Sequence, residues 1–263
     1  MVNVPPRVLI IAGSDSSGGA GIQADIKTVT MLGGYAMTAI TAITAQNTLG
    51  VQAVHPLPEE MVAAQIESCL SDIGADAVKI GMLGSPGVAR LVADRLDSFA
   101  GAIVFDPVMI ATSGSVLADD ETIAAFGRLM DIATLTTPNL PELAALSRMP
   151  IDSDAGIYDA AAALAARHDN YVLAKGGHAE GETVADLLLA PSGSVLRFDH
   201  ARLDTRHTHG TGCTLSSAIA TLLGRGQPID HAVRLARQFV FRALQAAPGF
   251  GQGHGPLGHQ MVR

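Results

Sequence analysis

Short runs of branched apolar residues recur along this 263-residue chain, and helically spaced segments alternate with them. Such runs, bounded by glycine, proline or polar residues, are typical of strands buried on both faces of a parallel sheet. The predicted strands are 8–12, 35–45, 76–80, 102–105, 133–137 and 171–174. The predicted helices are a segment ending near residue 32, then 59–73, 88–99, 120–130, 154–168, 215–223 and 230–246. This alternation predicts one α/β domain over residues 1–263, with a mostly parallel, doubly wound sheet flanked by helices.

Two segments late in the chain depart from the alternation. Residues 183–189 and 195–203 are both strand-like, and a Pro-Ser-Gly turn at 191–193 separates them. This spacing predicts an antiparallel hairpin added to the parallel sheet. The glycine-rich tail from residue 248 is expected to be irregular.

Charge and composition exclude several classes of protein. Hydrophobic residues make up 48% of the chain, but polar residues interrupt every apolar run before the ~18 residues that a membrane span needs. The net charge is −8 and there is no basic run, so nucleic acid is not an expected partner. Two cysteines without a CxxC pair indicate neither a disulfide framework nor a cysteine-based zinc site. The start of the chain is not a signal peptide, and we expect a cytoplasmic protein.

The segment 204–218 has the strongest chemical signature. Gly210, Thr211 and Gly212 precede Cys213, and an apolar helical run follows. The first N–H groups of a helix have no internal partner and carry partial positive charge, so this turn can bind a phosphate. A helix N-terminus also lowers the pKa of a thiol, and we therefore expect Cys213 to be able to act as a base. An ordinary glycine-rich loop with a buried cysteine remains the alternative.

The first strand leads into a loop, 13–21, that is rich in glycine and serine. The loop lacks the Gly-Lys-Ser/Thr of a phosphate-binding P-loop, and its glycine spacing does not fit a dinucleotide fingerprint. So many glycines favour close approach of a ligand to the backbone, although a plain strand-to-helix turn is the alternative.

An amide ends the second predicted strand. Gln46 offers a donor and an acceptor side by side, which suits the edge of a heteroaromatic ring. The neighbouring Asn47 is better explained as part of a turn. Met82, after the third predicted strand, either covers a planar ligand or fills the core.

Charged residues end three further strands. Asp106 precedes a proline at the end of one strand, which is a suitable position for a carboxylate linked to Mg²⁺. Glu142 follows Asn139 by three residues and either forms a capping box with it or lies near a metal and phosphate. Lys175 beside two glycines can contact phosphate as a point charge. Because parallel strands end at one edge of a sheet, we expect these residues to converge on one ligand site.

These motifs, taken in order, resemble the hydroxymethylpyrimidine/phosphomethylpyrimidine kinases of thiamine biosynthesis, in the ribokinase-like superfamily. The resemblance covers essentially the whole chain, and its first and last motifs are highly specific. The matching segments are 12–25, 44–48, 79–83, 106–109, 137–142, 175–178 and 207–214.

The resemblance implies a role for each motif residue. Gln46, Ala20, Met82, Thr44 and Asp25 would bind the aminopyrimidine, with Asp25 near its hydroxymethyl end. The N–H groups of 210–213 would form the anion hole, and Cys213 would replace the aspartate base of related sugar kinases. Asp106 and Glu142 would organise Mg²⁺, and Lys175, Asn139 and Thr208 the ATP. A homodimer is implied, and a monovalent cation is compatible with the family.

One departure and three alternatives stay open. Thr112 stands where the family often has a lysine in a loop near the phosphates, which puts that loop's hold on ATP or on a phosphorylated substrate in question. A pyridoxal or pyridoxine kinase has a similar anion hole and a planar substrate. A noncatalytic pyrimidine-binding regulator would bind without consuming ATP. A transferase with a cysteine nucleophile is the third alternative.

Overall fold

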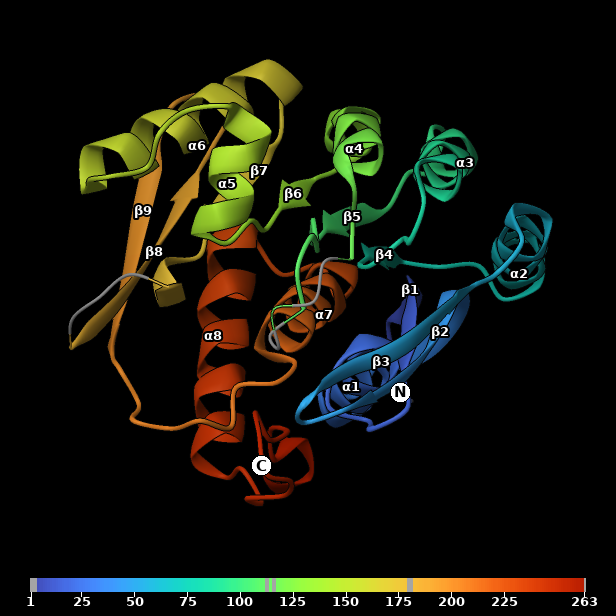
Figure 1. Cartoon of the computed structure of the whole chain (residues 1–263). Helices are drawn as coiled ribbons and strands as arrows, with labels where there is room; N and C mark the ends of the chain where they lie inside the picture. The colour runs from blue at the N-terminus through green and yellow to red at the C-terminus, as the bar shows by residue number, and fades with distance from the viewer. Residues whose placement is uncertain (1–3, 112–113, 115–116, 179–181, 263) are drawn as a thin grey trace.

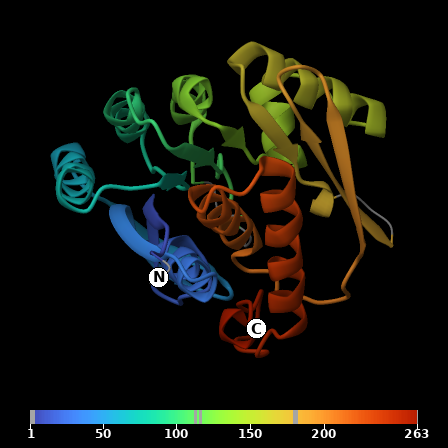
Figure 2. The same cartoon turned by 180° about the vertical axis from the view of Figure 1, so that it is seen from behind.

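The computed structural model describes residues 4–111, 114, 117–178 and 182–262. They form one twisted nine-stranded sheet with helices on both faces, as Figures 1 and 2 show from opposite sides. The predicted fold class is thus confirmed. Within the described part of the chain, every helix is too short or too polar to cross a bilayer.

The strands are ordered β3-β2-β1-β4-β5-β6-β7-β8-β9 across the sheet. Those from β1 to β7, except β3, run parallel, whereas β3, β8 and β9 each run antiparallel to the preceding strand. Their bounds are β1 Arg7–Asp15, β2 Tyr35–Asn47, β3 Gly50–Pro56, β4 Ala77–Ile80, β5 Ala102–Phe105, β6 Leu135–Thr136, β7 Tyr171–Ala174, β8 Thr183–Leu189 and β9 Val195–Ala201. The chain reverses its direction of travel across the sheet at β1, and ligands bind at such switch points.

The helices divide between the two faces of the sheet (Figure 1). On one face lie α2 Glu59–Asp72, α3 Pro86–Leu96, α4 Asp120–Ile132, α5 Leu140–Ser147 and α6 Asp154–His168. On the other lie α1 Gly21–Met31, α7 Thr211–Gly224 and α8 Ile229–Gln245, with the C-terminal tail beside α1 and α8. Short 3₁₀ turns occur at Gly176–His178 and His259–Met261. The second turn lies in the C-terminal tail, so the tail is more regular than the sequence predicted.

Most predicted elements are present, and the differences have local causes. Strand β3 was not predicted; it is an edge strand with mostly exposed side chains, so it lacks the apolar alternation that marks a half-buried strand. Helix α3 begins earlier than predicted because Ser85 accepts a hydrogen bond from Val88 N and Pro86 occupies the first turn. The predicted hairpin is present as β8 and β9.

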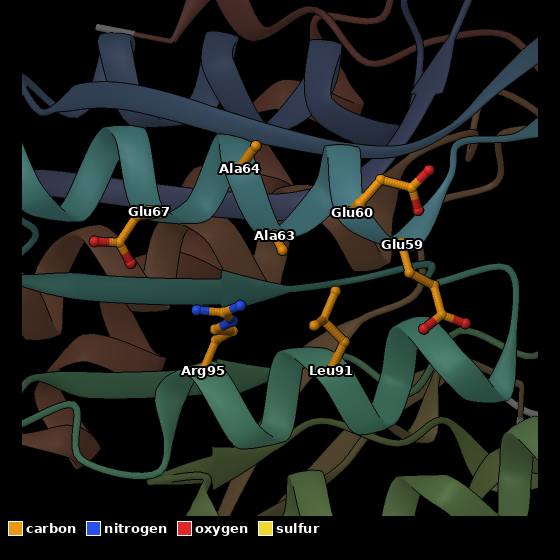
Figure 3. Close-up of a pocket in the computed structure, with 7 residues that line it drawn as sticks. All are labelled: Glu59, Glu60, Ala63, Ala64, Glu67, Leu91 and Arg95. Atoms are coloured by element: carbon orange, nitrogen blue, oxygen red, sulfur yellow. The ribbon is translucent and has the colours of Figure 1, made fainter.

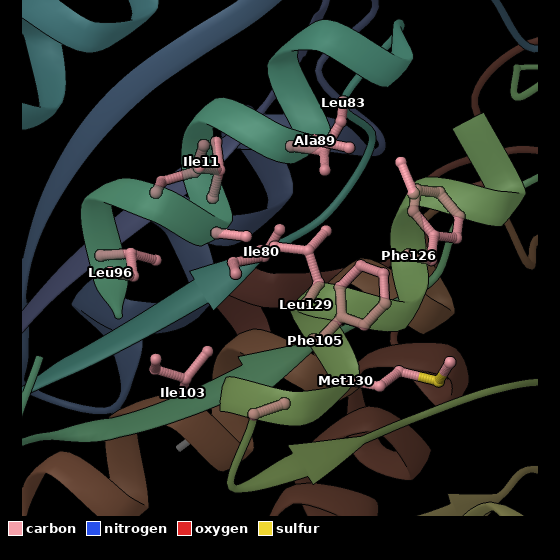
Figure 4. Close-up of a cluster of buried hydrophobic side chains, with 14 of the residues drawn as sticks. Ile11, Ile80, Leu83, Ala89, Leu96, Ile103, Phe105, Phe126, Leu129 and Met130 are labelled. Carbon is pink, nitrogen blue, oxygen red and sulfur yellow. The ribbon is translucent and has the colours of Figure 1, made fainter. Parts of the chain in front are cut away.

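The larger core lies between the sheet and the helices from α2 to α6 (Figure 4). Phe105 of β5 and Phe126 of α4 meet edge-on there, with ring centroids 5.1 Å apart. Both are buried among Ile80, Leu129 and Ile103. The pair packs α4 against the middle of the sheet, on the strand that leads into Asp106.

We expect Phe126→Ala to lower the free energy of unfolding by about 3–5 kcal/mol, because the deletion removes apolar contacts and leaves a cavity. Urea unfolding followed by circular dichroism measures the change. Phe250→Ala is the matched control: Phe250 is 66% exposed, and its truncation should change the stability by less than about 0.5 kcal/mol. Equal losses in the two variants would contradict the packing assigned to Phe126.

Candidate active site

One cavity of about 880 Å³ opens where β1, β4, β5 and β7 end and α7 begins. It is lined by all but one of the residues that the sequence predicted for a site. These are Ala20, Thr44, Gln46, Met82, Asp106, Asn139, Glu142, Lys175, Thr208, Gly210, Thr211, Gly212 and Cys213. The predicted convergence at the carboxyl ends of the strands is confirmed, and Asp25 is the residue that lies elsewhere.

The turn before α7 forms one wall of this cavity. Gly210 is left-handed at φ 87°, and a Cβ at this position would lie 1.9 Å from the carbonyl oxygen of Gly19. Only glycine permits both the conformation and the close approach. The contact places the glycine-rich loop after β1 against the first turn of α7, whose N–H groups can bind an anion.

A buried hydrogen bond between two side chains joins these two loops. His209 Nε2 lies 2.8 Å from Asp15 Oδ2, and both side chains are almost fully buried. The Asp15 carboxylate also accepts hydrogen bonds from the backbone N–H groups of Gly19 and Ala20. Burial alone would raise the pKa of Asp15, but the hydrogen bonds from His209, Ser17 and the backbone lower it to about 2. Asp15 was not singled out from the sequence.

The side-chain amide of Gln46 lies beside this pair. Its Oε1 is 3.1 Å from Thr44 Oγ1, and its Nε2 is 3.4 Å from His209 Nε2. Contacts at both ends hold the amide in one orientation at the cavity wall. The adjacent Asn47 is exposed and accepts a hydrogen bond from Leu49 N, which confirms its predicted place in a turn.

Charged side chains also line the cavity. Lys175 Nζ lies 2.9 Å from Asp106 Oδ1 and 3.9 Å from Glu142 Oε2. Burial would raise the pKa of Asp106, but the charges of Lys175 and Lys79 hold it below its ordinary value. For Glu142, burial outweighs the attraction of Lys175 and raises the pKa to about 7. Two carboxylates therefore share one lysine at the floor of the cavity.

Glu142 also has a structural function. Its Oε2 accepts a hydrogen bond from Asn139 N at 2.8 Å, and Asn139 Oδ1 accepts one from Glu142 N at 2.9 Å. This is the capping box predicted from the sequence, and it starts α5. Lys175 N donates to the carbonyl of Pro138, so the lysine and the cap are held together.

Cys213 lines the cavity in the first turn of α7, but the expectation of a lowered pKa is wrong. Burial raises the pKa of its thiol to about 11, and the nearby carboxylates of Asp25 and Asp106 act in the same direction. The positive charge of Lys79 and a backbone hydrogen bond from Gly21 oppose this rise without cancelling it. In this site, desolvation outweighs the helix dipole, so the thiol is protonated at neutral pH.

Asp25 is placed beneath the cavity and does not line it. Its carboxylate is fully buried, 2.9 Å from Lys79 Nζ and 2.6 Å from Ser217 Oγ. Contact with a substrate hydroxymethyl group, as the resemblance implied, is therefore not available to Asp25 in this structure. Lys79 was missed because it lies in an apolar strand, and a lysine in a buried strand is itself a signal that a partner charge must be near.

A smaller hollow of about 420 Å³ lies on the surface between α2 and α3 (Figure 3). Glu59, Glu60, Glu67, Leu91 and Arg95 line it, and it contains none of the predicted site residues. Among the described residues, no group of three or more His, Cys, Asp or Glu side chains is arranged to hold a metal ion. Thr112 lies outside the described residues.

Comparisons with known proteins now place this chain in a family. Residues 15–258 match the family model described as phosphomethylpyrimidine kinase. The chain is 43% identical over 258 residues to a hydroxymethylpyrimidine/phosphomethylpyrimidine kinase of Haemophilus influenzae, covering 96% of each chain. It is 46% identical over 257 residues to the protein of the same name from Streptomyces coelicolor, covering 97% of this chain and 94% of the relative.

Solved structures agree with this placement. An ADP complex of Bacillus subtilis pyridoxal kinase superposes with a TM-score of 0.91 at 33% identity, covering 98% of this chain and 99% of the other. A phosphomethylpyrimidine kinase from Clostridium difficile superposes with a TM-score of 0.80 at 38% identity, covering 90% and 99%. The chain belongs to the phosphomethylpyrimidine kinase family and is an enzyme of the kinase class.

Proposed function

We propose that this enzyme transfers the γ-phosphoryl group of ATP to 4-amino-5-hydroxymethyl-2-methylpyrimidine and then phosphorylates the monophosphate to the diphosphate, as a step of thiamine biosynthesis. The observation that carries the proposal is a single cavity lined by two chemically distinct groups of residues. One group presents the fixed amide of Gln46, and the other presents the N-terminus of α7 with Lys175. A planar heteroaromatic alcohol and a phosphate donor fit these two groups.

In the first group of residues, Gln46 would pair with the aminopyrimidine edge, because one amide supplies both a donor and an acceptor. Thr44 keeps the amide in place, and Met82 and the backbone of Ala20 line the same part of the cavity. The Asp15–His209 pair supports this group, since it holds the Ala20 N–H and approaches Gln46.

In the second group of residues, the N–H groups of 210–213 would hold the migrating phosphoryl group. A Cβ at Gly212 would lie 3.5 Å from Lys175 Nζ, so the lysine and the anion hole are adjacent. We assign Lys175, Asn139 and Thr208 to the nucleotide. Phosphoryl transfer depends mainly on positioning and charge neutralisation, which these groups supply.

Asp106 and Glu142 fit a magnesium ion. Mg²⁺ prefers oxygen ligands and is often held by one or two carboxylates together with substrate phosphates, and these two carboxylates face one cavity. When bound, the ion would neutralise charge on the transferring phosphate. By analogy with the family, we further propose that the enzyme binds a monovalent cation, forms a homodimer and is cytoplasmic. The use of ATP is consistent with that location.

We assign to Cys213 the role of taking the proton of the substrate hydroxyl. It lines the cavity in the same turn as the anion hole, so its sulfur and the phosphate site share one wall. Because the pKa of the unliganded thiol is about 11, only a small thiolate fraction is present at neutral pH. The chain's own contribution is then chiefly to position the reactants and to accept the proton as the new bond forms.

A pyridoxal kinase is the second candidate, because structures of pyridoxal kinases superpose on this chain over 98% of its length. ATP consumption with hydroxymethylpyrimidine, its monophosphate and pyridoxal, each offered alone, separates the two. We expect turnover on both pyrimidines. Turnover on pyridoxal alone would refute the substrate assignment, and turnover on none would refute the proposed activity.

We expect Gln46→Ala to raise KM for hydroxymethylpyrimidine by about tenfold or more, since it removes about 1–2 kcal/mol of hydrogen bonding to the ring. Steady-state kinetics at saturating ATP measures the change. Asn47→Ala is the control, because Asn47 is exposed and belongs to the turn; its KM should stay within twofold or so. A similar rise in both variants would indicate a disturbed loop and not a lost ring contact.

We expect kcat to rise with pH between about 8 and 10 if the Cys213 thiolate accepts the proton. Below a pKa of about 11 the thiolate fraction grows roughly tenfold per pH unit, and above pH 8 Glu142, with a pKa of about 7, is already ionised. Cys213→Ala should be slower and should lose this rise. A Cys213→Ala enzyme with wild-type turnover and the same pH profile would refute the base assignment.

A further inference from the structure

A line of buried charges lies beneath the cavity floor. Lys79 is fully buried and is among the largest fully buried side chains of the described chain. Its Nζ lies 2.9 Å from Asp25 Oδ2, and Ser217 Oγ donates to the other oxygen of that carboxylate at 2.6 Å. A buried lysine needs such a partner to remain charged, and the Asp25 carboxylate raises the pKa of Lys79 in spite of its burial.

The geometry of two helices brings this pair under Cys213. On α7, Ser217 lies one turn beyond Cys213 and therefore shares its helix face. On α1, Asp25 lies one turn beyond Gly21, whose backbone N–H is hydrogen-bonded to the Cys213 thiol. The contact between Gly21 and Cys213 and the contact between Asp25 and Ser217 thus lie one helical turn apart along α1 and α7. Lys79 lies beside the second of these contacts.

Gly81 leaves room for the ammonium group at the end of β4. A Cβ at this position would lie 2.7 Å from Lys79 Nζ, so a larger residue would push the lysine away. Lys79 is also one of the residues around the cavity, although it has no exposed surface. Its charge is therefore held at the cavity without being exposed to it.

We propose that Lys79 is a positioning residue of this site: its ammonium group, fixed by Asp25 and Ser217, supplies the positive charge that stabilises the Cys213 thiolate. The inference rests on the proposed role of Cys213 as the base, and it adds Lys79 as a group that acts through Cys213. The other charged groups facing Cys213 are Asp25 of α1 and Asp106 after β5, which both disfavour the thiolate, and Lys175 after β7, which also interacts with it. Lys79, which lies on β4, thus opposes the effect of the two carboxylates on the thiolate.

The test follows the thiolate of Cys213 directly, without substrate or ATP. Cys69→Ala removes the second thiol, and the rate of iodoacetamide alkylation is measured against pH, with Cys213 identified by mass spectrometry. Three further changes are made in that background. They are Asp25→Asn, the double change Lys79→Met with Asp25→Asn, and Ser217→Ala, which keeps both charges.

We expect Asp25→Asn to lower the alkylation midpoint, because it removes a negative charge near the thiol. Adding Lys79→Met to Asp25→Asn should raise the midpoint by about one pH unit or more, since the two proteins differ only in the lysine charge. Removing both partners also avoids an unpaired buried charge, which makes the double variant the one best suited to fold. Ser217→Ala should leave the midpoint close to that of the Cys69→Ala parent.

Opposite shifts separate an electrostatic role from a structural one, because a loosened site would move every midpoint in the same direction. Equal midpoints in Asp25→Asn and the double variant would overturn the proposal. If Asp25→Asn does not fold, the double variant is compared with the Cys69→Ala parent. An alkylation midpoint of the double variant that is not above that of the parent also overturns the proposal.

In kinetics, kcat of the double variant should fall at pH 8 and recover at higher pH, with KM for ATP near wild type. A wild-type enzyme without turnover would refute the kinase activity and leave the alkylation result standing.

Discussion

The site depends on one constraint: the charged side chains that are buried beside α7 must be paired with opposite charges. Each buried charge must be paired, because an isolated ion in a protein interior is strongly disfavoured. Two adjacent serines of α7 meet this need from one helix: Ser217 donates to Asp25, and Ser216 lies 3.3 Å from Asp106. The lysines at the ends of β4 and β7 complete the two pairs. Helix α7 is therefore positioned by polar contacts to two carboxylates as well as by its apolar face, and its N-terminus is aimed at the cavity as a result.

The segment that precedes α7 also contacts a part of the chain that is distant in sequence. Asp15 and His209 are 194 residues apart in sequence, yet their side chains pair in the wall of the cavity. This contact is possible because Gly210 and Gly19 allow the two backbones to approach each other. The switch point at β1 places the glycine-rich loop there, and α7, which lies on the same face of the sheet as α1, packs beside it. The proposed substrate and phosphate sites are thus built from distant segments that meet only in the folded chain.

The sequence was most informative where a local pattern determines a local structure. The apolar runs gave the parallel strands, and the spacing of Asn139 and Glu142 gave the capping box. Topology then explains why the residues at the strand ends could be grouped before any contact was known. Strand β3 escaped prediction because an exposed edge strand has no apolar period, and Asp25 was misplaced because its partner Lys79 lies in another element. Long-range pairing of buried charges is not encoded in any single window of residues.

Cys213 shows why a local rule is insufficient at such a site. Its position at a helix N-terminus favours the thiolate, but desolvation and two carboxylates oppose it, and the resulting pKa is about 11. At neutral pH about one thiol in ten thousand would then be ionised in the unliganded protein. A phosphoryl transfer with a loose transition state tolerates a base that is so rarely ionised, because the hydroxyl proton need not leave before the phosphorus–oxygen bond to the donor is largely broken.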